Sequence, residues 1–372
     1  MTKNSYILSI DQGTTSSRAA LISEDGNIVS QKNIEFKQYF PNNGWVEHDP
    51  RDILSSTIDC IKYVINESKV KPENIMTSGV TNQRETIVAW DKKSGDPIYN
   101  AIVWQDRRTE DICESLREKN VEDSIQKKTG LLIDPYFSAS KIKWILENVD
   151  RAKSLIADNN LIIGTIDTWL IWNLTNKQYH LTDVTNASRT MIYNIIDDCW
   201  DEELLKLFNI PREILPEVKN SMDNFGAISK DFFGSEIPIT GVAGDQQAAA
   251  FGQLCIEKGM VKSTYGTGCF MLMNTGKEVY QSQNKLLSTT AFKTSDQKMY
   301  ALEGSIFNAG TIVQWMRDEL TFFEKAGEIE ALASDAKNDI VFIPAFTGLG
   351  APYWRSDIRG SIHGITRDTS KS

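Results

Sequence analysis

The N-terminal segment of the 372-residue chain places a polar tip between two apolar runs. Tyr6–Ile10 and residues 18–23 have the composition of β-strands, and the intervening Asp11–Ser17 carries one glycine and four hydroxyl side chains. A third run, Ile28–Phe36, follows a short turn, so the sequence predicts an opening β-meander. Hydroxyls suit phosphate and a carboxylate suits Mg²⁺, so a phosphate loop is one interpretation of the tip. A solvated hairpin turn is the other.

A similar pattern returns in the last third of the chain. Val261–Tyr265 and Phe270–Asn274 flank the tip Gly266–Gly268, whose middle residue is a threonine. Two such tips suggest a duplicated architecture with a domain change near residues 250–256. The chain is long enough for two cores, and 41% of its residues are hydrophobic.

Between the two tips, runs typical of strands alternate with runs at helical spacing. Residues 51–66 repeat apolar side chains at the helical period, while 75–80, 86–90 and 161–166 are short and apolar. A further extended run is predicted at Ile192–Ile196, and a helix is predicted over Ala248–Leu254. This alternation indicates a mixed α/β protein.

Composition and missing motifs exclude several classes of protein. The sequence contains neither the G-x-x-x-x-G-K-[ST] loop of P-loop NTPases nor the G-x-G-x-x-G of Rossmann enzymes. A net charge of -10 argues against a nucleic-acid partner, and three histidines make a metal–histidine cluster or a Ser-His-Asp triad an unfavoured interpretation. Five scattered cysteines without a C-x-x-C pair are typical of a reducing compartment. No signal-like or membrane-spanning run is evident, so we expect a cytoplasmic protein without a membrane span.

Three positions that end or follow apolar runs are candidates for catalytic or binding residues. Arg84 and Glu85 lie between two predicted strands and could grip hydroxyl groups, although a simple ion pair is the usual meaning of such neighbours. Trp104 also ends an apolar run, where a core position is common. Asp245 follows a strand and opens a predicted helix, which suits a helix cap or a general base.

Taken together, these segments resemble the glycerol kinases, which belong to the sugar-kinase family with the actin/hexokinase-like ATPase fold. The resemblance covers nearly the whole chain and rests on several motifs in the same order: Asp11–Arg18, Gly44–Pro50, Thr81–Thr86, Val103–Arg108, Tyr136–Asn148 and Gly244–Gln247. It implies an α/β, two-domain, ribonuclease-H-like fold with an interdomain cleft. The expected division is a glycerol-binding and phosphate-loop domain over 1–252 and a nucleotide-binding domain over 253–372.

The resemblance also implies a role for particular residues. Those expected to bind glycerol are Arg84, Glu85, Tyr136, Asp245 and Gln246, with Trp104 and Phe270 as aromatic walls. Those expected to hold the nucleotide are Thr14, Thr15, Ser16, Arg18, Thr267, Gly310 and Gln314. Asp245 would be the catalytic base, and Asp11 with Asp245 would organise Mg²⁺.

The implied activity is ATP-dependent phosphorylation of glycerol to sn-glycerol 3-phosphate in glycerol catabolism, with ATP and Mg²⁺ as cofactors. The expected partners are glycerol, ATP or ADP, and a second copy of the chain or a complementing C-terminal chain. Two alternatives remain open at this stage: a polyol-binding fragment with weak or no activity, and a kinase of a related sugar such as xylulose or gluconate.

Two places depart from the glycerol-kinase pattern. Gly234–Glu236 stands where some members carry a longer loop that binds a sugar bisphosphate, and the carboxylate of Glu236 would repel such an anion. Gly360–Arg367 resembles the start of the family's second signature but runs into Asp368–Ser372, where the sequence stops. We therefore expect a second domain that is incomplete, with an unfinished adenine pocket.

Overall fold

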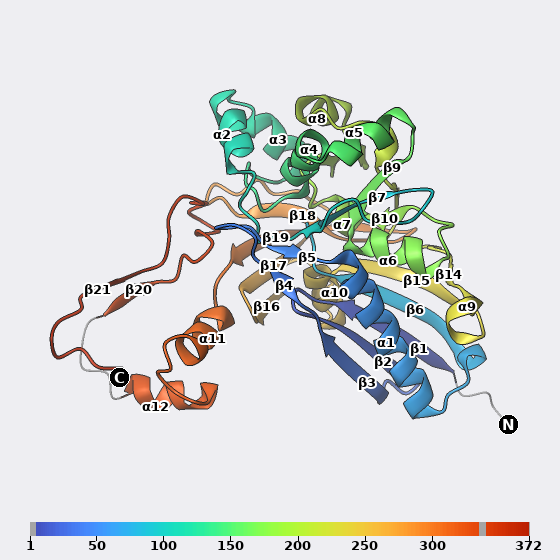
Figure 1. The fold of residues 1–372 in the computed structure, drawn as a ribbon, viewed down its shortest axis with the longest axis horizontal. Coiled ribbons are helices and arrows are strands. Elements are labelled where there is room, and N and C mark those ends of the chain that lie inside the picture. The colour runs from blue at the N-terminus through green and yellow to red at the C-terminus, as the bar shows by residue number, and fades with distance from the viewer. Residues whose placement is uncertain (1–4, 335–339, 372) are drawn as a thin grey trace.

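The computed structural model describes residues 5–334 and 340–371, and its largest sheet has six strands in the order β14-β15-β6-β1-β2-β3 (Figure 1). These strands are β1 (Tyr6–Gln12), β2 (Ser16–Ser23), β3 (Ile28–Glu35), β6 (Ile75–Asn82), β14 (Ala227–Ile228) and β15 (Ile237–Gly244). The predicted meander is confirmed, because β1, β2 and β3 are antiparallel neighbours. By contrast, β1, β6 and β15 run parallel, so their carboxyl ends meet at one edge of the sheet.

Helix α1 (Pro50–Ser68) connects β5 to the strand β6 and packs against β2 and β3. Its N-terminus is capped by Asp49, whose carboxylate accepts a hydrogen bond from the N–H of Arg51 at 2.8 Å. The apolar positions that predicted the helix are buried against the sheet, among them Ile53, Ile61 and Val64. The helical spacing at residues 51–66 is thus confirmed.

A second sheet has five strands, in the order β4-β5-β8-β7-β9. Its strands are β4 (Gln38–Tyr39), β5 (Glu47–His48), β7 (Ile87–Asp91), β8 (Ala101–Ile102) and β9 (Leu161–Thr165). The helices between β8 and β15 in the chain are α2 (Glu110–Glu118), α3 (Glu122–Thr129), α4 (Ser138–Asn148), α5 (Asp150–Ala157), α6 (Ile166–Leu174), α7 (Val184–Ala187), α8 (Glu202–Phe208) and α9 (Lys230–Phe233). Helix α6 contacts strands of both sheets and so joins them.

Shorter elements complete this half of the chain. Two small sheets pair β10 (Leu181–Asp183) with β13 (Glu217–Lys219) and β11 (Tyr193–Asn194) with β12 (Cys199–Trp200). Single 3₁₀ turns are η1 (Pro72–Asn74), η2 (Arg212–Ile214) and, later in the chain, η3 (Ala326–Glu328).

Helix α10 (Asp245–Gly252) leads from β15 to a four-stranded sheet in the order β16-β17-β19-β18. Its strands are β16 (Val261–Tyr265), β17 (Cys269–Gly276), β18 (Leu287–Lys293) and β19 (Lys298–Ile306). The remaining elements are α11 (Gly310–Asp318), α12 (Ile329–Ser334), β20 (Val341–Ile343) and β21 (Ser361–His363). Figure 1 shows these last elements to one side, away from the six-stranded sheet.

Some predicted elements differ from the structure in their bounds. The apolar run at Ile192–Ile196 forms only the two-residue strand β11, because Ile195 already lies in a buried turn whose N–H donates to the carbonyl of Lys128. The helix predicted over Ala248–Leu254 begins three residues earlier, at Asp245, and ends at Gly252. Within 5–334 and 340–371, no helix is both long and apolar enough to cross a membrane.

Candidate active site

A polar cavity of about 360 Å³ lies where the six-stranded and four-stranded sheets face each other. Its walls come from loops at strand ends and from the first turn of α10. The lining residues are Gly13, Thr14, Thr15, Arg18, Arg84, Glu85, Trp104, Tyr136, Asp245, Gln246, Thr264, Gly266, Thr267, Gly268 and Phe270. Most of the side chains predicted to bind a polyol or phosphates therefore share one cavity.

The sheet topology explains why distant segments meet here. In the register of the parallel strands, Gln12 of β1 and Gly244 of β15 both lie beside Asn82 of β6. The residues that follow these three positions must emerge at the same edge. Ligands commonly bind outside the carboxyl ends of parallel strands, and this edge forms the floor of the cavity.

The turn after β6 presents Arg84 and Glu85 to the cavity. Glu85 adopts a φ of 61°, a left-handed conformation that is costly for a residue with a side chain. The N–H of Thr86 closes the turn on the carbonyl of Arg84 at 2.7 Å. Both side chains are buried, so this strained turn holds two charged groups inside the protein.

Asp245 begins α10 and faces the same space. Its carboxylate accepts hydrogen bonds from the backbone N–H of Gln246 at 2.7 Å and from the Gln246 side-chain amide at 3.1 Å. The Nε of Arg84 lies 3.3 Å from the same carboxylate. The Asp245 side chain is still 37% exposed, so it remains accessible to a ligand in the cavity.

Gly244 makes the approach of Arg84 to Asp245 possible. A Cβ at this position would lie 2.6 Å from the Cγ and Cδ atoms of Arg84. Any larger residue would therefore push the arginine out of the cavity wall.

Aromatic rings form the opposite wall. The ring centroids of Trp104 and Tyr136 are 5.7 Å apart, and those of Trp104 and Phe270 are 5.9 Å apart, in edge-to-face arrangements. The hydroxyl of Tyr136 accepts a hydrogen bond from Arg84 at 3.4 Å. Burial, together with the charge of Glu85, raises the pKa of Tyr136 well above its usual value, so this hydroxyl stays protonated.

The two glycine-containing tips lie at the other end of the cavity. Gly13 starts the first tip with a tight turn in which its N–H donates to the carbonyl of Ser16 at 2.9 Å. The Oγ1 of Thr14 accepts a hydrogen bond from Nε1 of Trp104 at 2.9 Å, which ties this tip to the aromatic wall. In the second tip, Gly266 accepts a hydrogen bond from the N–H of Gly310 at 2.8 Å, so α11 begins against it.

Four of the predicted residues do not line the cavity. Ser16 contributes its carbonyl to the first tip, and Gly310 packs so closely on Gly266 that a Cβ would lie 2.7 Å from the Gly266 oxygen. Gln314 is exposed on α11. Asp11 lies behind the first tip, 4.0 Å from Arg18.

The electrostatics of Asp11 suit a bound cation. Burial raises the pKa of Asp11, and the charge of Asp245 raises it further, while Arg18 opposes this shift. A divalent cation beside Asp11 would offset this unfavourable interaction with the charge of Asp245. Among the described residues, no group of three or more His, Cys, Asp or Glu is arranged to hold a metal. A cation at Asp11 would therefore need further oxygen ligands, such as those of a bound phosphate.

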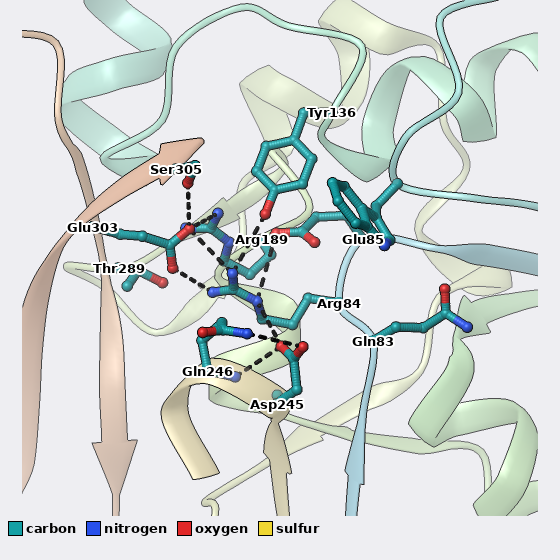
Figure 2. A network of polar contacts seen from close by, with 12 residues as sticks. Gln83, Arg84, Glu85, Tyr136, Arg189, Asp245, Gln246, Thr289, Glu303 and Ser305 are labelled. Carbon is teal, nitrogen blue, oxygen red and sulfur yellow. Dashed lines mark hydrogen bonds and ion pairs between the residues drawn. The ribbon is translucent and has the colours of Figure 1, made fainter. Parts of the chain in front are cut away.

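Three polar residues near the cavity were not predicted from the sequence. Glu303 on β19 accepts hydrogen bonds from Arg84, and Arg189 donates to Glu85 (Figure 2). Gln247 accepts from Arg84 at 3.2 Å. Glu303 could have been noticed as a lone carboxylate at an inward position of a strand pattern. Arg189 follows a short helix in a segment with no clear period, so the sequence offers no comparable signal.

A second hollow of about 400 Å³ lies on the six-stranded sheet and is not a candidate for the same chemistry. Its wall includes Ile7, Met222, Phe251 and Phe292, and none of its lining side chains is ionisable. The polar cavity is therefore the candidate active site.

Comparison with known proteins agrees with this geometry. The model of the FGGY family of carbohydrate kinases, N-terminal domain, matches residues 6–252, and that of the C-terminal domain matches residues 261–372. The chain belongs to the FGGY family of carbohydrate kinases. The predicted two-domain α/β fold of the actin/hexokinase type is thereby confirmed.

Curated members of the FGGY family are similar over nearly the whole chain. It is 56% identical over 369 residues to the glycerol kinase of Petrotoga mobilis, covering 99% of this chain and 74% of that protein. It is 54% identical over 368 residues to glycerol kinase 2 of Thermotoga maritima, covering 98% of this chain and 74% of that protein.

Solved structures with this fold are similar over nearly the whole chain. The crystal structure of Plasmodium falciparum glycerol kinase with ADP matches with a TM-score of 0.86 and 41% identity, over 99% of this chain and 74% of that chain. A xylulose kinase from Lactobacillus acidophilus matches with a TM-score of 0.82 and 23% identity, over 99% of this chain and 74% of that chain, which shows the fold alone.

Proposed function

We propose that this FGGY kinase transfers the γ-phosphoryl group of ATP to glycerol and forms sn-glycerol 3-phosphate. The observation that carries the proposal is the shared cavity, in which a hydroxyl-binding set and an accessible carboxylate face two phosphate-sized tips. The names of the relatives at 53–56% identity support glycerol as the acceptor.

The polyol would bind at the buried end of the cavity. Arg84 can donate to a glycerol oxygen and Glu85 can accept from a glycerol hydroxyl, while Tyr136 and Gln246 can do either. Trp104 and Phe270 would pack against the carbon chain. Polar groups on one side and rings on the other match the two faces of a three-carbon polyol.

Asp245 would act as the general base. As the attacking hydroxyl forms its bond to the γ-phosphorus, its proton would pass to the Asp245 carboxylate, and the bond to the ADP oxygen would break. Arg84 lies 3.3 Å from this carboxylate and orients it toward the cavity. The hydrogen bonds from Gln246 keep the same carboxylate in place at the start of α10.

The nucleotide would lie along the two tips. Thr14, Thr15, Ser16 and Arg18 of the first tip and Thr267 of the second offer hydroxyl, backbone and guanidinium donors to phosphates. Gly310 and Gln314 would contact the part of the nucleotide beyond the phosphates. When bound, Mg²⁺ would neutralise phosphate charge beside Asp11 and Asp245.

The two domains would bind different ligands. Residues 1–252 would bind glycerol and carry the first phosphate tip, and residues 253–372 would bind the nucleotide. The separate family matches at 6–252 and 261–372 support this boundary. We further propose a cytoplasmic location and self-association of the chain.

Two alternatives remain testable. A kinase for xylulose or gluconate is disfavoured because the chain is 53–56% identical to glycerol kinases but only 23% identical to the matching xylulose and gluconate kinases of Lactobacillus acidophilus. The other alternative is a chain that binds the polyol without transferring phosphate. It would need the same polyol-binding side chains at the buried end of the cavity, so the structure fits both functions there.

An assay that measures ADP release distinguishes these functions. With ATP and Mg²⁺, we expect turnover with glycerol and at least tenfold lower kcat/KM with xylulose or gluconate, measured as ADP release. Comparable rates with all three would contradict glycerol specificity. Glycerol binding by calorimetry without any turnover would instead identify a polyol-binding chain.

A further inference from the structure

Glu303, a fully buried residue on β19, carries a charge that has no assigned role and is bound by two arginines. Its Oε2 accepts from Nη1 of Arg84 at 2.6 Å, and its Oε1 accepts from Nη2 of the same arginine at 3.1 Å. Oε1 also accepts from Nη2 of Arg189 at 2.9 Å and from the hydroxyl of Ser305 at 2.8 Å. Both carboxylate oxygens are therefore occupied by donors from the protein.

The two bonds from Arg84 fix the plane of its guanidinium group. A two-pronged pairing of arginine with carboxylate allows much less rotation than a single hydrogen bond. With both terminal nitrogens held by Glu303, the Nε edge of Arg84 faces Asp245 at 3.3 Å (Figure 2). The two hydrogen bonds to Glu303 therefore fix the orientation of the Arg84 side chain.

Arg189 performs a similar task for Glu85. Its Nε donates to Oε1 of Glu85 at 2.6 Å while its Nη2 contacts Glu303, so one arginine joins both carboxylates. Burial disfavours the charge of Glu303, but Arg189 and Arg84 outweigh it and lower the pKa of Glu303 to about 2. The carboxylate is therefore ionised at neutral pH and pairs with both arginines.

The partners come from different parts of the chain. Arg84 and Glu85 follow β6 of the six-stranded sheet, whereas Glu303 and Ser305 belong to β19 of the four-stranded sheet. Buried ion pairs add little net stability compared with apolar packing, so a cluster of this kind calls for a role beyond stability.

We propose that Glu303, together with Arg189, is a positioning residue that orients Arg84 and Glu85 for the polyol and makes the polyol site depend on the placement of β19. The inference rests on the proposed function for the identity of the ligand. The contacts themselves are independent of that ligand, so each part can fail separately.

The first test compares Glu303→Gln and Glu303→Asp with a surface control. The control is Glu278→Gln, because Glu278 is an exposed carboxylate of the same domain that pairs with Lys258 at 2.8 Å. We expect Glu303→Gln to weaken glycerol binding at least tenfold in calorimetry and to change the affinity for ATP less than twofold. Glu303→Asp should recover part of the loss, and Glu278→Gln should match the wild type.

Two outcomes of this test would overturn the proposal. One is wild-type glycerol affinity in a folded Glu303→Gln protein. The other is an equal loss of glycerol and ATP affinity, which would indicate a general structural role.

A second measurement needs no glycerol. The Nε–H signal of Arg84 in a ¹⁵N spectrum, identified by its loss in Arg84→Lys, reports the environment of the guanidinium group directly. We expect this signal to shift in Glu303→Gln and to stay in place in Glu278→Gln. An unchanged Arg84 signal in Glu303→Gln would refute the positioning role. If the signal shifts in Glu303→Gln but the wild-type protein binds no glycerol, only the proposed substrate is refuted.

Discussion

The two ends of the cavity are built in different ways. At the polyol end, Arg84, Glu85, Arg189 and Glu303 are buried and linked by contacts of 2.6–3.1 Å. At the phosphate end, the cavity residue Arg18 is 55% exposed and lies 4.0 Å from Asp11, which is 38% exposed behind the first tip. The first set is held by contacts within the protein, and the second is more exposed to solvent.

This difference follows from what each ligand brings. A neutral polyol has no charge to organise its site, so the protein must hold the donors and acceptors in place beforehand. A nucleotide brings several negative charges and a divalent cation, which can order exposed side chains and loop N–H groups on binding. The side chains are therefore held most firmly at the polyol end, where the neutral ligand is least able to organise them.

The largest effect is expected at Asp245, which lies between the two ends. Asp245→Asn keeps a hydrogen-bonding side chain but cannot take the proton, so turnover should fall by about 10²–10⁴-fold. Glycerol affinity should change only a few-fold, because the other polyol contacts remain. Steady-state kinetics and calorimetry test this, with the exposed Asp296→Asn as control, and wild-type turnover would remove Asp245 from the role of base.

The second-largest expected effect is a difference in the free energy of unfolding between a variant at the polyol end and a variant beside the phosphate end. Glu85→Ala leaves Arg189 without its closest carboxylate in a buried site, which typically costs about 3–5 kcal/mol. Asp11→Ala breaks an exposed pair, and such pairs contribute about 0–1 kcal/mol. Urea unfolding of both variants measures the difference, and similar losses would mean that the two ends are equally ordered.

The pH dependence of stability is a smaller and more specific effect. The pKa of Glu303 is about 2 in the folded protein against an ordinary 4.5, so its contribution is complete above about 4.5 and is lost as the pH falls toward 2. The difference in unfolding free energy between wild type and Glu303→Gln should therefore shrink below pH 4.5. A difference that stays constant from pH 7 to 3 would contradict the ion-paired state of Glu303.

Local patterns predicted part of this fold well. The meander over β1–β3 and the helix at residues 51–66 depend on alternation, helical spacing and turn residues that lie close together in sequence. The pairing of β6 and β15 beside β1 depends on contacts between distant segments, which a single sequence does not reveal. The bounds of short strands such as β11 were missed for the same reason.

The candidate site shows the same limit. Arg84, Glu85 and Asp245 were singled out because each follows an apolar run, and the parallel strands do bring them together in the cavity. Their roles came from resemblance to glycerol kinases. The partners Glu303 and Arg189 were missed because only the packing of β19 and of the turn after α7 against this edge gives them a function.

The most direct test of the account measures both ligands against one variant from each end. Calorimetry should show that Arg84→Ala weakens glycerol binding at least tenfold while ATP binding changes little. Arg18→Ala should show the reverse, with weaker ATP binding and unchanged glycerol affinity. Loss of both ligands in each folded variant, or wild-type glycerol affinity in Arg84→Ala, would contradict a cavity with a polyol end and a phosphate end.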